Sequence, residues 1–221
     1  MPANIRVDVV SDMVCPYCYL GKRRLEKAIA GRPDLNITVN WRPFQLSPDM
    51  PREGRDRLEH YEQLFGNERA KQIMESMQDT GMDDGIAFDY RPGARSPNTL
   101  AAHVLMRLAD ENSSVDMDVL AEKLFYAHHV DCDDIGDLDV LMRIAKEVGM
   151  DVPELRARLR DEEIEALVTG QVEEARGQGV SGVPFFIING RYGISGAQPA
   201  DSLMAAFDQI ASSEDGQELS E

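Results

Sequence analysis

A pair of cysteines between a strand pattern and a helix pattern is the feature that most restricts how this chain folds. Ile5, Val7 and Val9 alternate with polar residues, which is typical of a short strand. Cys-Pro-Tyr-Cys follows at residues 15–18, and apolar residues then recur at steps of three and four to about residue 30. A second alternating segment, residues 37–41, completes a strand–helix–strand unit. Such a unit predicts two parallel strands joined by a helix.

The position of Cys15 and Cys18 at the start of the predicted helix suits them to redox chemistry. Free N–H groups and the positive end of the helix dipole favour a thiolate there. The i, i+3 spacing puts both sulfurs on one face of the helix, within reach of a disulfide. Pro16 suits the first helical turn, where its missing N–H costs nothing, and Tyr17 completes the motif. We expect Cys15, which is nearer the helix end and more exposed, to be the nucleophile and Cys18 to be the resolving thiol.

The rest of the sequence predicts a block of helices followed by a β-hairpin. Helical periodicity runs through residues 58–82, 97–112, 117–130, 137–149 and 152–177, and no convincing strand lies among them. Leucines at helical spacing in this block are expected to form its core: Leu100, Leu105, Leu108, Leu120, Leu124 and Leu141. Strand signals return on both sides of Asn189-Gly190, a dipeptide that favours a tight hairpin turn. A last helix is expected over residues 199–211, and both ends of the chain are expected to join one mixed sheet.

Three segments resemble DsbA-family thiol–disulfide oxidoreductases of the FrnE-like type. Residues 11–25, SDMVCPYCYLGKRRL, resemble the opening of that family. Residues 180–189, VSGVPFFIIN, resemble its cis-proline loop and the strand that follows, and residues 195–199, SGAQP, resemble the turn before its last helix. The resemblance spans nearly the whole chain, although the middle matches only in being helical and in the sequence DIGD at residues 134–137.

The resemblance implies an α/β fold in which a thioredoxin-like domain is interrupted by an all-helical insertion. The domain would comprise residues 1–50 and 178–212, and the insertion residues 51–177. Composition alone marks residues 213–221 as an acidic tail that is expected to be frayed. The resemblance also implies that the Val183–Pro184 peptide bond is cis and faces the cysteine pair. The backbone of Val183 would then pair with an incoming substrate.

Together, motif and resemblance predict a thiol–disulfide oxidoreductase. Cys15 would attack a substrate disulfide, and Cys18 would resolve the mixed disulfide; the reverse steps oxidise a dithiol. The expected substrates are protein or small-molecule thiols and disulfides. No cofactor is expected beyond the redox-active disulfide, and glutathione is a candidate co-substrate.

The alternative is a glutathione-dependent transferase or isomerase of the kappa-like type, related to 2-hydroxychromene-2-carboxylate isomerase. Those relatives generally place serine where the nucleophilic cysteine stands. The presence of both cysteines in this chain therefore favours redox chemistry.

The charge of the chain restricts its partners. Its 221 residues include 23 basic and 40 acidic side chains, for a net charge of −17, which repels the phosphates of nucleic acid and anionic lipid. No stretch approaches the ~20 apolar residues of a membrane span, and the N-terminal residues lack the pattern of a secretory signal. We therefore expect a cytoplasmic monomer or homodimer. A structural disulfide is disfavoured in that compartment.

The remaining histidines and cysteine raise the question of a metal site, and no metal is expected. A zinc site would need two ligands beyond Cys15 and Cys18. The candidates for these ligands in the sequence are Cys132 and a nearby histidine. A zinc-stabilised binding module and a buried pair of inert cysteines stay open as alternatives. His128 and His129 are expected on the solvated end of a helix, because their spacing to Cys132 fits no common zinc pattern.

Two aspartates near the motif are assigned to structure. Asp12 is expected to make a loop or capping hydrogen bond, and its charge would oppose a thiolate at Cys15. Asp8 is expected on the surface of an alternating, half-exposed strand, with a buried acid beneath the disulfide as the alternative.

Overall fold

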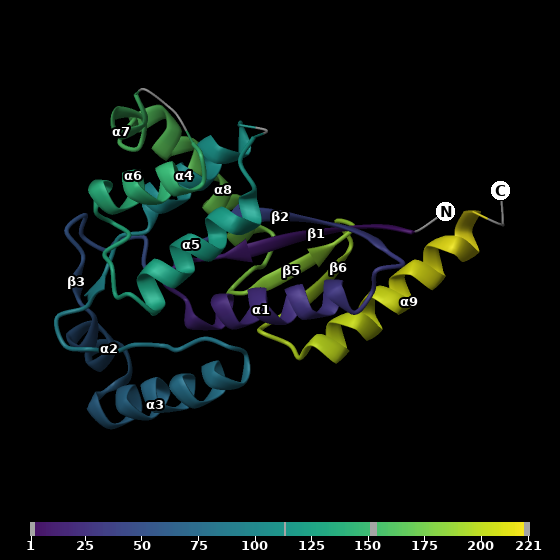
Figure 1. Cartoon of the computed structure of the whole chain (residues 1–221), viewed down its shortest axis with the longest axis horizontal. Helices are drawn as coiled ribbons and strands as arrows, with labels where there is room; N and C mark the ends of the chain where they lie inside the picture. The colour runs from purple at the N-terminus through teal and green to yellow at the C-terminus, as the bar shows by residue number, and fades with distance from the viewer. Residues whose placement is uncertain (1–2, 113, 151–153, 219–221) are drawn as a thin grey trace.

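A mixed four-stranded sheet forms the centre of the protein in a computed structural model that describes residues 3–112, 114–150 and 154–218 (Figure 1). Its strands, in spatial order, are β2 (Asn36–Pro43), β1 (Asn4–Ser11), β5 (Phe185–Ile188) and β6 (Tyr192–Ser195). β1 runs parallel to β2 and antiparallel to β5, and β5 and β6 form the hairpin. The two ends of the chain therefore join one mixed sheet, as the sequence predicts.

β1 lies in the middle of the sheet, with one face apolar through Ile5, Val7 and Val9 and the other face buried from Asp8 onward. Val7 and Val9 pack in one cluster with residues of α1 (Pro16–Ala30) and α9 (Ala200–Glu218), the two helices that lie along one side of the sheet in Figure 1. Val10 points to the opposite face, where it packs with Ala175 of α8 (Glu162–Gly177). This placement holds the end of β1, and the cysteine motif that follows it, between two layers of helices.

The middle of the chain is helical, but its elements differ in detail from the prediction. They are β3 (Arg55–Asp56), α2 (Arg57–Phe65), α3 (Asn67–Asp83), β4 (Arg95–Ser96), α4 (Leu100–Asp110), α5 (Met117–His129), α6 (Leu138–Glu147), α7 (Leu155–Arg158) and α8. The expectation of no strand is wrong, because β3 and β4 form a short antiparallel pair. The predicted helix over residues 58–82 is two helices, because Gly66 between them has φ of 78°. The helix predicted over residues 152–177 is also divided, and residues 151–153 lie outside the described residues.

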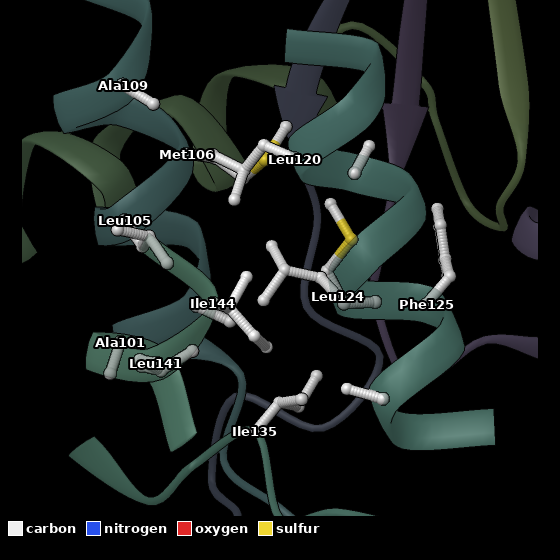
Figure 2. Close-up of a cluster of buried hydrophobic side chains, with 14 of the residues drawn as sticks. Ala101, Leu105, Met106, Ala109, Leu120, Leu124, Phe125, Ile135, Leu141 and Ile144 are labelled. Carbon is white, nitrogen blue, oxygen red and sulfur yellow. The ribbon is translucent and has the colours of Figure 1, made fainter. Parts of the chain in front are cut away.

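The helical block has its own apolar core, and that core extends to the cysteine motif. Figure 2 shows side chains of α4, α5 and α6 pointing into a common interior. Five of the six predicted core leucines are at most 3% exposed, and Leu100 packs against them half-buried. Cys15, Cys18 and Tyr19 belong to the same cluster, so the start of α1 is packed directly against the helical block.

The C-terminal helix is longer than expected. α9 continues to Glu218, so residues 213–218 are helical and not a frayed tail, and residues 219–221 lie outside the described residues. Within the part of the chain that the structure describes, every helix is too short or too polar to cross a membrane.

Asp8 is buried, and the expectation of a surface position is wrong. Its side chain is 3% exposed, although it lies on the more polar face of β1. Asn40 on the neighbouring β2 donates a hydrogen bond of 3.1 Å to its carboxylate, and Arg6 forms an ion pair of 3.2 Å with it. These partners cover the carboxylate and compensate its charge, which strand periodicity alone does not show.

Candidate active site

The cysteine motif opens α1 in the way the sequence predicts. Cys15 is the N-cap residue with φ of −84° and ψ of 114°, and Pro16 occupies the first turn. Both cysteines are free thiols. Cys15 is 4% exposed and Cys18 is 1% exposed, so the expected difference in exposure is small. Neither sulfur lies on an open surface, and Cys15 is reached through a cavity.

The Cys15 sulfur contacts the loop before β5. Its Sγ donates a hydrogen bond of 3.6 Å to the carbonyl oxygen of Val183, a residue that precedes the paired part of β5. The Val183–Pro184 peptide bond is cis. Pro184 is buried against α1 at Gly21, where a Cβ atom would lie 2.9 Å from the proline Cγ. Gly21 therefore allows the loop to approach α1 closely enough for Val183 to meet Cys15.

Cys18 lies beneath Cys15 in an apolar setting that disfavours its thiolate. Burial is the main cause that raises the pKa of the Cys18 thiol well above its usual value, and the adjacent Cys15 sulfur raises it further. The Ser11 hydroxyl and the backbone of Asp12 act in the opposite direction and lower this pKa. Ser11 is the last residue of β1 and is 1% exposed. Ser11 thus supplies a buried polar group next to the second thiol.

Asp12 makes the loop hydrogen bonds that the sequence suggested and does not cap α1. Its carboxylate accepts a hydrogen bond of 2.7 Å from the backbone N–H of Leu46 and lies 3.3 Å from Nε2 of His103. No side chain caps the N-terminus of α1 in the described structure. The Asp12 side chain is 1% exposed and is fully engaged by these two partners.

A cavity of about 400 Å³ lies next to Cys15. The cavity is lined by Cys15, Pro16, Tyr17 and Val183, whereas Cys18 and Pro184 are buried and are not among its lining residues. The predicted site residues therefore divide into a group that lines the cavity and a group that does not. The structure brings Cys15 and Val183 into direct contact and places Tyr17, which is 47% exposed, at the rim.

The opposite wall of the cavity comes from α2 and α3, where the sequence predicts a helix and no site residue. Its residues are His60, Tyr61, Leu64, Phe65, Arg69 and Ile73. The sequence held one signal for this wall, the adjacent pair Leu64-Phe65 directly before Gly66. A large apolar pair at a helix end is an exposed surface that a partner or ligand can cover.

The two adjacent histidines at the end of α5 are buried, so their predicted place on the solvated surface is wrong. His128 and His129 are each 2% exposed. Burial, followed by the charge of Arg57, holds the pKa of both rings well below the usual range. Arg57 is itself 1% exposed and donates a hydrogen bond of 2.9 Å to the carbonyl oxygen of His128. The histidines therefore sit in the protein interior as neutral rings.

Cys132 lies apart from the cysteine pair. Its sulfur is 3.2 Å from the carbonyl oxygen of Asp89 and 3.9 Å from a guanidinium nitrogen of Arg57. Among the residues that the structure describes, no three or more histidines, cysteines or acids are grouped to hold a metal ion.

The comparison with known families agrees with this geometry. A model of the family described as "DSBA-like thioredoxin domain" matches residues 6–208. The chain belongs to this family. Uncharacterized protein YwbO of Bacillus subtilis strain 168 is 28% identical over 189 residues, which are 84% of this chain and 87% of that protein. A probable DsbA oxidoreductase from Streptomyces coelicolor is 31% identical with a TM-score of 0.86, and the match covers 95% of this chain and 91% of that one.

More distant members of the structural group share the thioredoxin fold with this DSBA-like chain. Cytosolic disulfide reductase DsbM from Pseudomonas aeruginosa, solved with GSH, is 16% identical with a TM-score of 0.61, covering 93% of this chain and 98% of its own. A 2-hydroxychromene-2-carboxylate isomerase is 15% identical with a TM-score of 0.66, covering 96% of this chain and 98% of its own. At these identities the likeness shows the fold alone.

Proposed function

We propose that this DSBA-like protein is a thiol–disulfide oxidoreductase in which Cys15 is the nucleophile and Cys18 the resolving thiol. One observation carries the proposal: two free thiols, three residues apart, stand at the start of α1, and only Cys15 lines the adjacent cavity. A substrate that enters the cavity meets Cys15, while Cys18 stays covered until a mixed disulfide has formed. The difference in access orders the two steps.

The two cysteine thiols supply both electrons that the reaction needs. The Cys15 thiolate attacks one sulfur of the substrate disulfide, a Cys15–substrate bond forms, and the other substrate sulfur leaves as a thiolate that takes up a proton. Cys18, once deprotonated, attacks the Cys15 sulfur and releases the second substrate thiol. The substrate gains two electrons, and the Cys15–Cys18 pair becomes a disulfide that an external thiol must reduce. Glutathione is our proposed candidate for that thiol.

Substrate positioning is the main task that this exchange leaves to the protein. The carbonyl oxygen of Val183 accepts the hydrogen bond from Cys15 in the free protein. We infer that a bound substrate strand takes over contacts with the Val183 backbone and so presents its sulfur to Cys15. Pro16 fixes the first turn that carries the nucleophile, and Pro184 supports the Val183 loop from behind.

The isomerase alternative is less well supported than redox exchange. The isomerase neighbour shares the fold of this chain, and at 15% identity that likeness does not extend to activity. The free Cys18 thiol directly behind Cys15 has no task in a reaction that only adds glutathione to a substrate. We therefore assign the site to redox exchange, in a protein that we propose acts in the cytoplasm.

Reduction of insulin disulfides by dithiothreitol tests the proposal. The wild-type protein should accelerate the reaction, Cys15→Ser should abolish the acceleration, and Cys132→Ser, which removes the thiol outside the site, should retain it. Titration of the Cys15–Cys18 pair against glutathione buffers, read by alkylation and mass, should show one two-electron transition. Full activity of Cys15→Ser, or a pair that never oxidises, would contradict the assignment.

A further inference from the structure

The wall that α2 and α3 place opposite Cys15 is strongly apolar. Tyr61, Leu64, Phe65 and Ile73 face a cavity of about 400 Å³, a size within the ~300–1,000 Å³ of typical small-molecule sites. Leu64 is 56% exposed and Phe65 is 43% exposed, so part of this wall is open to solvent. A ligand with a flat apolar body would cover surface that water now contacts, which favours its binding.

The free charge in the cavity is positive. Arg69, near the start of α3, lines the cavity and forms no ion pair with any residue that the structure describes. Burial, aided by the charge of Arg55, lowers the pKa of His60, and burial lowers that of His128 much further, so both lining histidines are neutral at pH 7.

The carboxylate that lines the cavity already has hydrogen-bond partners within the protein. Asp12 is the acidic side chain among the described lining residues, and it is 1% exposed. Its two oxygens are engaged by the Leu46 N–H and by His103. Among the described lining residues, the cavity therefore offers a cation for a carboxylate of a ligand and no free carboxylate for an ammonium group.

We propose that this cavity selects low-molecular-weight aromatic disulfides whose rings carry a carboxylate. The ring would lie against Leu64 and Phe65, the carboxylate would meet Arg69, and one disulfide sulfur would face Cys15. This assignment rests on the proposed function, because it takes Cys15 as the attacking sulfur. Glutathione disulfide fits the cavity less well, since it has little apolar surface and carries ammonium groups that find no free acid there.

The chemistry of such a substrate follows the exchange already described. Cys15 forms a bond to one aryl sulfur, and the first arenethiolate leaves. Cys18 then displaces the second arenethiolate from Cys15, so that two electrons pass from the cysteine pair to the substrate. The product is two molecules of an aromatic thiol that carries a carboxylate.

Three disulfides separate the contributions of the ring and the charge. 5,5′-Dithiobis(2-nitrobenzoic acid) has an aromatic ring and a carboxylate on each half, 4,4′-dithiodipyridine has an uncharged ring, and glutathione disulfide has carboxylates and an ammonium group on each half but no ring. Rates with the reduced protein are measured by stopped flow and divided by the rates with free N-acetylcysteine, which corrects for the intrinsic reactivity of each disulfide. We expect the corrected rates to fall in the order in which the compounds are named.

The matched variants are Arg69→Gln and Lys71→Gln, which remove one positive charge each from α3, inside and outside the cavity. Arg69→Gln should slow the reaction with the nitrobenzoic acid disulfide about fivefold, the factor expected for a partly exposed charge pair. It should slow the reaction with dithiodipyridine less than twofold. Lys71→Gln should slow each less than twofold. Leu64→Ser should slow both aromatic substrates and leave the ratio between them unchanged.

The outcomes distinguish this inference from the proposed function. Equal effects of Arg69→Gln and Lys71→Gln, or a corrected rate for glutathione disulfide above those of both aromatic disulfides, would overturn the substrate assignment alone. If Arg69→Gln slowed insulin reduction as much as it slowed the reaction with the nitrobenzoic acid disulfide, the cavity would instead bind a side chain of a protein substrate. That result would also overturn the substrate assignment. If Cys15→Ser reacted with all three disulfides at the wild-type rate, that result would instead contradict the proposed function.

Discussion

The Cys15 sulfur and the carbonyl oxygen of Val183 are joined by a hydrogen bond of 3.6 Å, although the two residues are 168 positions apart. The contact exists because β1 and β5 are neighbours in the sheet, so that the loops at their ends meet. Gly21 allows the approach, since its missing side chain leaves room for Pro184. The proposed nucleophile and the backbone that we propose pairs with substrate are thus brought together by the sheet and not by local sequence.

Substitution of Ser11 should affect the second step of the exchange. Without the hydroxyl, Ser11→Ala should raise the pKa of Cys18 further, because burial already disfavours its thiolate and the hydroxyl opposes that effect. The pH profile of mixed-disulfide resolution should move to higher pH, and the rate at pH 7 should fall about tenfold for each pH unit by which the profile moves. Rapid-quench analysis of mixed-disulfide decay between pH 6 and 9 measures this. Ser202→Ala, on the exposed side of α9, is the control. If the pH profiles of the two variants coincide, the Ser11 hydroxyl does not affect the pKa of Cys18 in the resolving step.

Substitution of Gly21 should disturb the contact between α1 and the Val183 loop. A methyl group there would lie 2.9 Å from Pro184 Cγ and 3.2 Å from Phe186 Cζ, so the loop must shift. Overpacking of this kind costs about 1–3 kcal/mol, which exceeds the gain of up to about 1 kcal/mol from alanine in a helix. Gly21→Ala should therefore lower the free energy of unfolding and slow insulin reduction.

Gly170→Ala is the matched control for that variant. Gly170 lies in α8, and nothing lies within 4 Å of the position of its absent Cβ. This substitution should raise the free energy of unfolding by about 0.5–1 kcal/mol, because only the helix propensity changes. Urea denaturation measures both variants. A stabilised Gly21→Ala with normal activity would show that the close approach is not needed.

The buried histidines should make the protein less stable in mild acid. The folded-state pKa of His129 is held well below the usual value, first by burial. As pH falls below about 6.5, the unfolded chain binds a proton at this residue and the folded chain does not, so the free energy of unfolding decreases by up to about 1.4 kcal/mol per pH unit. His129 stacks with Tyr19 and Phe125, and its Nε2 has no hydrogen-bond partner in the described structure.

His129→Phe tests this pH dependence. The aromatic contacts are kept, and the titrating group is removed. Urea denaturation between pH 5 and 6 should show a slope of stability against pH that is lower than in the wild type by about one proton, or about 1.4 kcal/mol per pH unit. An unchanged slope would mean that His129 is protonated in the folded protein.

The parts of the structure that the sequence predicts are those set by local pattern. The start of α1 follows from the Cys15–Pro16 pair after an alternating strand, and the hairpin follows from Asn189-Gly190, because each needs a particular backbone conformation that few residues favour. The fold class follows from the same local elements and from their resemblance to the family.

The parts that the sequence does not predict are set by tertiary neighbours. His128 looks like a surface residue at a helix end, and it is buried because Arg57 from α2 packs beside it. Arg69 looks like one of many charges on a helix surface, and only the fold turns it toward the cavity at Cys15. Ser11 is one polar residue at a strand end, and its place beside Cys18 depends on how β1 meets α1.

We propose that Cys15 forms the mixed disulfide with substrate and that Cys18 resolves it. Cys18→Ser removes the resolving thiol and leaves Cys15 accessible from the cavity, so incubation with insulin should trap a covalent adduct on Cys15. Mass spectrometry of the intact protein and of its peptides, with and without dithiothreitol, measures the adduct and its site. We expect a reducible adduct on Cys15 in Cys18→Ser and none in Cys15→Ser. An adduct on Cys18 in the Cys15→Ser protein, or no adduct in Cys18→Ser while the wild type still reduces insulin, would contradict it.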